Sequence, residues 1–260
     1  MGSRERRLIA ATLAFAATAC AAQTQACTAA QLAPVDGWLA QHPWRVGSTN
    51  AERLVDAGCK HSPVDRDVTI VAAAYDRGTR YDKNLVVAFV STRVVAAFTG
   101  TIEEDASLMV GRDSLHLDTA RYDLAPGMRA IGLDVSSAKS GPHCADGGFG
   151  ATRTLFVRDG AVLRPVLRGV LLMSWQVEGG TAPCPDADSE GTGTPATTTT
   201  TLAVEPHATH GFADIALTSV TDLHPGRRTR VVLHYDGSAY VGNGFEPWQP
   251  GVVPDSAHPH

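Results

Sequence analysis

Two histidines lie close enough in the sequence to bind one metal ion. His207 and His210 are separated by two residues in the run His207-Ala-Thr-His210, and imidazole nitrogens are common ligands of zinc. The run follows Pro206, which favours a turn, and the His-Glu-x-x-His pattern of zinc hydrolases does not occur in the sequence. Because no third ligand stands near the two histidines, the sequence predicts no metal site.

Carboxylates gather in two short segments. Asp186-Ala-Asp188-Ser-Glu190-Gly191 resembles the first half of a calcium-binding loop, in which alternate acids before a glycine surround the cation. The twelfth position of that loop, which should be a bidentate acid, is Thr197. We therefore expect a solvated acidic loop and no resident cofactor. Glu103-Glu104-Asp105 is likewise predicted to be a polar turn and not a catalytic cluster.

Nucleophilic serine chemistry needs a presented serine beside a base. Ser136-Ser-Ala-Lys139 spells Ser-x-x-Lys and Lys139-Ser-Gly141 spells Lys-Ser-Gly, two motifs of penicillin-recognising enzymes. In those enzymes the motifs use separate lysines, whereas here they share one. Gly-x-Ser-x-Gly is absent from the sequence. The sequence predicts no catalytic residue.

The N-terminus has the order of an export signal. Basic residues at Arg4 to Arg7 precede an apolar run from Leu8 to Ala19, and small residues follow, so residues 1–22 are predicted to be a signal peptide. Cleavage before Gln23 would release a soluble periplasmic protein. Alternatively, Thr18-Ala19-Cys20 resembles a lipobox, in which a lipidated Cys20 would anchor the protein to the envelope.

The remaining cysteines suit an oxidising compartment. Cys27, Cys59, Cys144 and Cys184 allow three pairings, and none of them forms a Cys-x-x-Cys pair that would indicate zinc or redox chemistry. Their neighbourhood in the sequence favours disulfides between Cys27 and Cys59 and between Cys144 and Cys184.

Charge narrows the choice of partners. Loss of residues 1–22 removes three Arg and one Glu, which leaves 19 basic against 26 acidic side chains and a net charge near −7. Nucleic acid would be repelled by this surplus of negative charge. A basic protein partner suits it better.

The elements that position these residues are predicted to be mainly strands. We expect a sandwich or propeller-like antiparallel body that forms a single β domain over residues 67–245, with a long loop at 182–197. A helical N-terminal segment, residues 23–66, is expected to pack on this body, and residues 246–260 to form a disordered tail. The helices are predicted at Val35 to Gln41 and from Thr49 or Asn50 to Ala57. The predicted strands are Val68 to Tyr75, Leu85 to Ser91, Val94 to Thr101, Ser107 to Val110, Ser114 to Asp118, Met128 to Val135, Arg153 to Val157, Val162 to Leu167, Leu171 to Val177, Thr197 to Val204, Ala213 to Val220, Thr229 to His234 and Ser238 to Val241.

Two hairpins are marked by Asp-Gly, the preferred central pair of a type I′ turn. They are predicted at Asp159-Gly160 and at Asp236-Gly237. The second, Asp236-Gly237-Ser238-Ala239-Tyr240, resembles the Ser-Gly-x-x-Tyr loop of bacterial periplasmic lysozyme inhibitors and related immunity proteins against peptidoglycan hydrolases. This sequence departs from that motif at Asp236, which stands in place of Ser. The chain also resembles uncharacterised exported β proteins of Gram-negative bacteria in runs such as Leu155-Phe-Val-Arg-Asp-Gly.

The resemblance implies a binding protein without catalysis. We expect a periplasmic inhibitor whose loop occludes a peptidoglycan hydrolase, with Tyr240 as the aromatic anchor and Asp236, Gly237 and Ser238 as further contacts. One alternative is a structural or assembly component of the envelope. The other is a polysaccharide hydrolase that uses a pair of carboxylates.

Overall fold

The computed structural model describes residues 24–44, 53–76, 78, 82–139, 144–182, 184, 191–249 and 251–254. Strands hold 61% of the described residues and helix 5%, which confirms a mainly β protein with one short helix near the N-terminus. The elements are β1 (Gln25–Ala26), α1 (Ala29–Leu39), β2 (Leu54–His61), β3 (Thr69–Asp76), β4 (Asp82–Val90), β5 (Val94–Glu103), β6 (Leu115–Ala125), β7 (Met128–Val135), β8 (Gly147–Phe149), β9 (Thr152–Asp159), β10 (Val162–Leu171), β11 (Met173–Glu178), β12 (Thr194–Thr209), β13 (Phe212–Thr221), β14 (His224–Tyr235), β15 (Tyr240–Val241) and β16 (Val252–Pro254).

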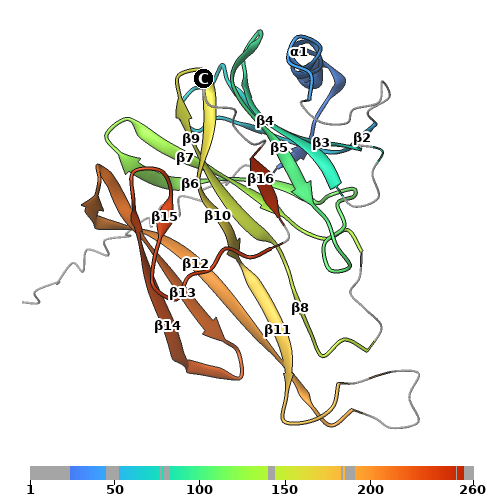
Figure 1. Ribbon diagram of the computed structural model, residues 1–260, viewed down its shortest axis with the longest axis vertical. Coiled ribbons are helices and arrows are strands. Elements are labelled where there is room, and N and C mark those ends of the chain that lie inside the picture. Colours follow the sequence, from blue (N-terminus) through green and yellow to red (C-terminus); the bar gives the residue numbers. More distant parts are fainter. Residues whose placement is uncertain are drawn as a thin grey trace, which may run out of the picture.

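Two sheets make up the body (Figure 1). The first has the strand order β1-β2-β3-β4-β5-β10-β9-β7-β6, with β16 added beside β5, and the second has the order β15-β14-β13-β12-β11-β8. Neighbouring strands are antiparallel except for β10 and β5, among the pairs that the structure describes. The sheets are curled, and the arrangement is consistent with a β-sandwich-like fold.

Strands in the middle of the molecule are buried on both faces. Phe156 of β9 packs in a core with Ile70 and Leu133, while its neighbour Leu155 packs in a second core with Ile215 of the other sheet. Successive side chains of a strand point to opposite faces, so a strand covered on both sides must be apolar at every position. This explains the unbroken apolar run in β9.

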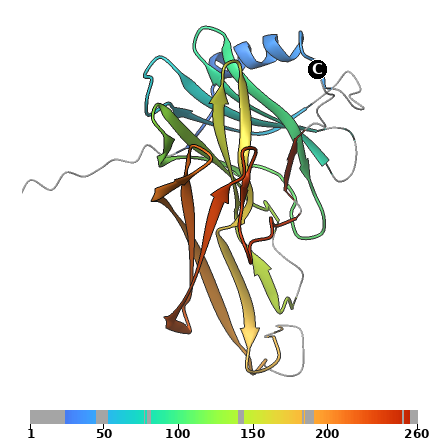
Figure 2. The same ribbon diagram turned by 60° about the vertical axis from the view of Figure 1, so that its left-hand side comes forward.

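Helix α1 covers the outer face of the first sheet. Thr28 caps it in a reciprocal capping box with Gln31. Val35 then packs in a third core with Val71 and Ala73 of β3. Figures 1 and 2 show the helix at one end of the molecule and the far ends of β11 and β12 at the other. The predicted helix is therefore present, but it begins at Ala29 rather than at Val35.

The second predicted helix is wrong where the structure describes it. Leu54–His61 is strand β2, which pairs with β3 through partners such as Cys59 and Val71. Thr49 and Asn50 lie outside the described residues. Pairing in the sheet prevails here over a weak local helical signal, because sheet stability comes from cross-strand contacts that the local sequence does not reveal.

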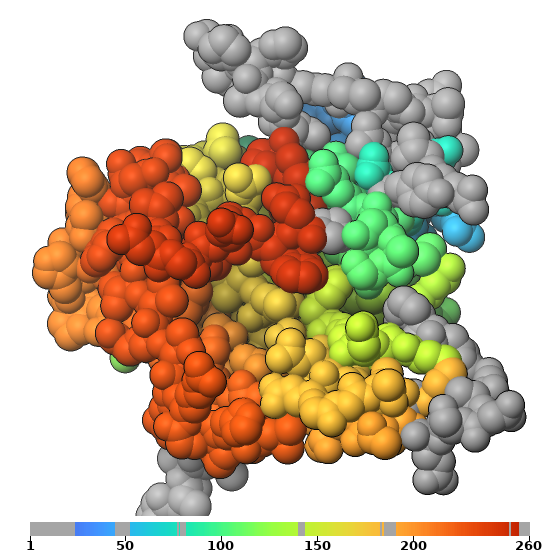
Figure 3. All heavy atoms as spheres, turned by 60° about the horizontal axis from the view of Figure 1, so that its bottom comes forward, coloured from blue at the N-terminus to red at the C-terminus, as the bar shows by residue number. Residues whose placement is uncertain are grey.

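The predicted disordered tail is also wrong in part. Val252–Pro254 forms β16 beside β5, and the N–H of Trp248 donates a 2.8 Å hydrogen bond to the carbonyl oxygen of Gly169. The indole of Trp248 lies 5.0 Å from the ring of Phe149. Figure 3 shows this C-terminal segment (red) crossing the molecule toward the green strand β5. The edge of β5 and an apolar contact thus order the segment, while residues 250 and 255–260 lie outside the described part.

Two further segments differ from the secondary structure predicted for them. The predicted strand at Ser107 to Val110 does not form, because Asp105 accepts hydrogen bonds from the backbone of Ser107 and Leu108 in a turn. The loop predicted at 182–197 ends earlier, since β12 begins at Thr194.

Both predicted disulfides are present. Cys27 is bonded to Cys59, and Cys144 is bonded to Cys184. The first ties the segment before α1 to strand β2, and the second joins the segment before β8 to the segment between β11 and β12. Disulfides form and persist in oxidising compartments, so both bonds point to an exported location. The predicted signal peptide and Cys20 lie outside the described residues.

Candidate functional site

The loop between β14 and β15 is held by one carboxylate. Oδ1 of Asp236 accepts hydrogen bonds from the N–H of Ser238, from its hydroxyl and from the N–H of Ala239, each 2.8 Å long. The backbone bond to Ala239 and those to Ser238 lower the pKa of Asp236 to about 2. Tyr235 pairs with Tyr240, so the loop has four residues and the predicted two-residue turn is wrong. Asp236, Gly237 and Ser238 are exposed.

The turn predicted at Asp159-Gly160 is also shifted. Asp159 pairs with Val162, so Gly160 and Ala161 are the central residues of that two-residue turn. Of the two, only Gly160 has a positive φ, at 60°. This is the pattern of a type II′ turn, in which glycine takes the first central position.

Tyr240 is not exposed as an anchor for a partner would be. Its exposed fraction is 4%, and its hydroxyl donates a 2.6 Å hydrogen bond to the carbonyl oxygen of Ala213. Burial raises the pKa of this phenol above its ordinary value. The ring also packs against that of Tyr235. In this structure Tyr240 supports the base of the loop from inside, which corrects the contact role predicted for it.

An apolar groove of about 880 Å³ opens beside this loop. Its walls come from the segment between β2 and β3, from β4, from the turn between β6 and β7, and from the hairpin of β12 and β13. Charged groups at the groove include Asp65, Asp123 and Arg158. Apolar lining residues are Val64, Val68, Phe89, Leu124, Met128 and Ala213.

His210 connects the groove to the loop. It precedes Gly211, which lines the groove, and its Nδ1–H donates to the carbonyl oxygen of Tyr235 at 2.8 Å. Tyr235 is the last residue before the loop. Arg164 donates to the carbonyl oxygen of Ser238 at 2.7 Å from the neighbouring sheet. The exposed loop is therefore connected to the groove wall through the β12–β13 hairpin.

A buried ion network supports the strand that carries one groove wall. Arg153 binds both carboxylate oxygens of Asp134, at 2.6 and 2.7 Å, and lies 2.6 Å from a carboxylate oxygen of Asp118. Arg153 also donates to the hydroxyl of Tyr122. Burial raises the pKa of Tyr122, and the neighbouring carboxylates raise it further against the lowering effect of Arg153. The network fixes β6 immediately before Asp123 and Leu124 enter the groove wall.

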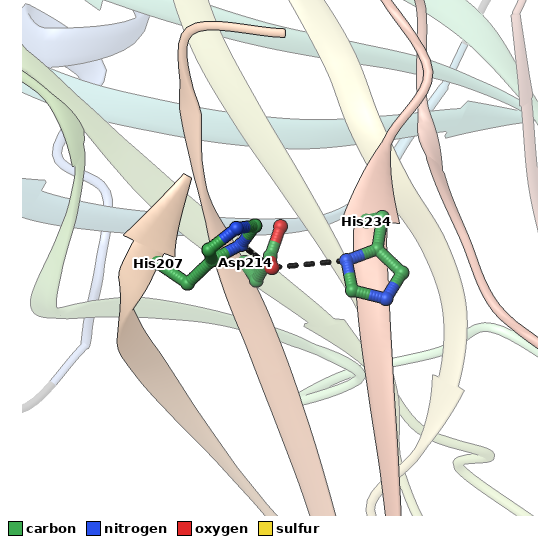
Figure 4. A group of neighbouring side chains, drawn as sticks. All are labelled: His207, Asp214 and His234. Carbon is green, nitrogen blue, oxygen red and sulfur yellow. Dashed lines mark hydrogen bonds and ion pairs between the residues drawn. The ribbon is translucent and has the colours of Figure 1, made fainter. Parts of the chain in front are cut away.

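A second cluster of side chains lies on three neighbouring strands of the second sheet. His207 of β12, Asp214 of β13 and His234 of β14 converge on one point (Figure 4). The Nδ1 atoms of the two histidines lie 2.6 and 2.9 Å from the same oxygen, Oδ2 of Asp214. The sequence singled out His207 but paired it with His210, which has a different partner. No local pattern in the sequence marked Asp214 or His234 as a possible metal ligand.

The other segments considered in the sequence either have a structural role or lie outside the described residues. Glu104 is buried and forms a 2.7 Å ion pair with Lys83. The hydroxyl of Ser137 accepts hydrogen bonds from the backbone of Met109 and of Lys139. The predicted acidic loop at Asp186 to Glu190 lies outside the described residues.

Comparisons with known proteins found no relative of this chain. No protein-family model matches it, and neither curated proteins nor solved structures gave a match. The resemblance to lysozyme inhibitors therefore stays a prediction from residues 236–240. Within the described part of the chain, no helix has the length and apolar character that crossing a membrane requires.

Proposed function

We propose that this protein is an exported binding protein that recognises its partner with the apolar groove and the adjoining Asp236–Ser238 loop. The observation that carries the proposal is the connection between them: His210 contacts the backbone of Tyr235 at the base of the loop, and Gly211 beside it lines the groove. A concave apolar surface with a few charged groups is the usual form of a binding site.

The loop suits recognition because it is ordered before any partner arrives. Three hydrogen bonds to Asp236 fix its backbone, and the buried Tyr240 fixes its base. A preformed loop loses little conformational entropy on binding, so more of the contact energy appears as affinity. Ser238 and Gly237 then offer a hydroxyl and an accessible backbone to the partner.

The partner class that we propose is a basic peptidoglycan hydrolase, whose active site the loop region would block. The acidic net charge near −7 after export supports attraction to a basic enzyme. The Asp236–Tyr240 resemblance supports the same class. In this proposal the apolar groove, and not Tyr240, receives an apolar side chain of the enzyme and supplies most of the affinity.

A small apolar ligand is the second candidate. The groove volume of about 880 Å³ falls within the range of ligand pockets, about 300–1,000 Å³. Such a ligand would lie along Leu124 and Met128 with a polar end near Arg158.

An affinity capture separates the two candidates. The immobilised chain, residues 23–260, is exposed to envelope and secreted fractions, and captured proteins are assayed for lysis of peptidoglycan. Capture of a lytic enzyme whose activity falls in a one-to-one ratio with added protein supports the inhibitor. Capture of no hydrolase, together with saturable binding of an apolar fluorescent probe that Met128→Arg abolishes, replaces it with the ligand-binding candidate.

A further inference from the structure

Three potential metal ligands converge on the face of the second sheet that lies opposite the groove-lining Ala213. They belong to His207, Asp214 and His234, each of which offers one ligand atom, and these atoms all lie within 4.8 Å of one another. Asp214 is 2% exposed, whereas the side chains of His207 and His234 are 75% and 52% exposed. The carboxylate is thus at the bottom of the cluster, and the imidazoles stand at its open side.

The strand register produces this convergence. Ile215 pairs with Leu233, so Asp214 lies directly across from His234 on the antiparallel neighbour. On the other side, β12 runs from Val204 to Ala208 while β13 runs only from Ile215 to Ala213. The extra residues in β12 form a bulge, and bulges commonly redirect a side chain at functional positions. This bulge turns His207 toward Asp214.

A hydrogen bond to the other carboxylate oxygen orients Asp214. The hydroxyl of Thr209 donates a 2.8 Å hydrogen bond to Oδ1 of Asp214, which leaves Oδ2 to face both imidazoles. Metal-binding carboxylates are characteristically held in this way by a further hydrogen bond.

The donor set selects the class of cation. Two imidazole nitrogens and one carboxylate oxygen suit zinc and related divalent transition metals, whereas calcium and magnesium prefer oxygen ligands alone. Bonds of about 2.0–2.2 Å around a tetrahedral ion separate the ligand atoms by about 3.3 Å. The observed separations of 2.6 and 2.9 Å need to open by only a fraction of an ångström. The exposed imidazoles can make that movement.

We propose that His207, Asp214 and His234 bind one divalent transition metal ion of the zinc class, with the fourth position open to solvent. Three strands would then be joined at one point by the ion. Each imidazole binds through Nδ1, so a neutral ring carries its proton on the exposed Nε2. The proposal is independent of the groove, because the cluster lies on the opposite face of the sheet.

Equilibrium dialysis and calorimetry with Zn²⁺ test this proposal on the folded chain, residues 23–260. We expect one Zn²⁺ per chain, and affinity at least tenfold lower in His207→Ala and in His234→Ala. Thr209→Val should weaken binding by about tenfold through the orientation of Asp214. His224→Ala is the matched control, since His224 is an exposed histidine of the same strand as His234, and it should bind like the wild type. With Co²⁺, the visible bands of a four-coordinate site should appear and should be lost in His207→Ala.

Two results would overturn the proposal. One is the lack of saturable Zn²⁺ binding by wild-type protein with native circular dichroism. The other is Zn²⁺ binding that is unchanged in a folded His207→Ala/His234→Ala double variant. Either result would leave the cluster as a buried carboxylate satisfied by hydrogen bonds.

Discussion

The hydroxyl of Tyr240 donates its hydrogen bond to the carbonyl oxygen of Ala213, and this contact places the tyrosine inside the protein rather than on its surface. Ala213 lines the groove, so the same bond joins the groove wall to the base of the Asp236–Ser238 loop. The tyrosine therefore holds together the two parts of the proposed binding region.

The variant Tyr240→Phe should show whether Tyr240 stabilises the fold or contacts the partner directly. Loss of the hydroxyl leaves the carbonyl of Ala213 without its buried donor, which costs about 1–3 kcal/mol in the free energy of unfolding. Affinity for a partner should stay within about threefold, because the ring does not reach the surface. Urea denaturation and binding measurements on the same preparation test both points. A variant of unchanged stability that loses partner binding would restore Tyr240 as a direct contact.

Loop order should depend on the ionisation of Asp236. Its pKa is lowered to about 2 in the folded protein, against about 3.9 for an unperturbed carboxyl. The stabilising effect is therefore fully present above about pH 4 and is lost as the pH falls toward 2. Amide chemical shifts of Ser238 and Ala239 should titrate near pH 2, and Asp236→Asn should abolish the transition. A midpoint close to 3.9 would contradict the hydrogen bonding described for this loop.

Arg153 should be a sensitive charged position of the first sheet. Its replacement by Ala leaves Asp118 and Asp134 without their shared cation in a largely buried place, and breaking a buried ion pair costs about 3–5 kcal/mol. Arg121→Ala is the control, because the pair of Arg121 with Asp123 is exposed and should change the unfolding free energy very little. Equal losses in the two variants would show that burial does not determine the energy of these pairs.

Local patterns in the sequence were enough to predict most strands and both disulfides. They failed where distant pairing decides the structure. Strand β2 is ordered by β3, and β16 by β5, and neither partner is visible from Leu54 or Val252 alone. The turn at Asp236 was mispredicted because its carboxylate fixes four residues instead of two.

The proposed metal site was likewise beyond prediction from local sequence patterns. His207 was noticed from its spacing to His210, yet its neighbours in space are Asp214 and His234, on two other strands. A bulge in β12 creates that proximity. Nothing in the spacing of these three residues predicts the bulge or the register that brings them together.

The most direct test of the proposed binding region compares two matched valines. Val64 lines the groove and is 69% exposed, while Val162 is 56% exposed and lies on β10, outside the groove lining. Both Val64→Arg and Val162→Arg should fold, since each side chain already faces solvent. The account predicts that Val64→Arg weakens capture of the partner at least tenfold and that Val162→Arg captures it as the wild type does. Capture that is unchanged in Val64→Arg would contradict the groove as the binding surface.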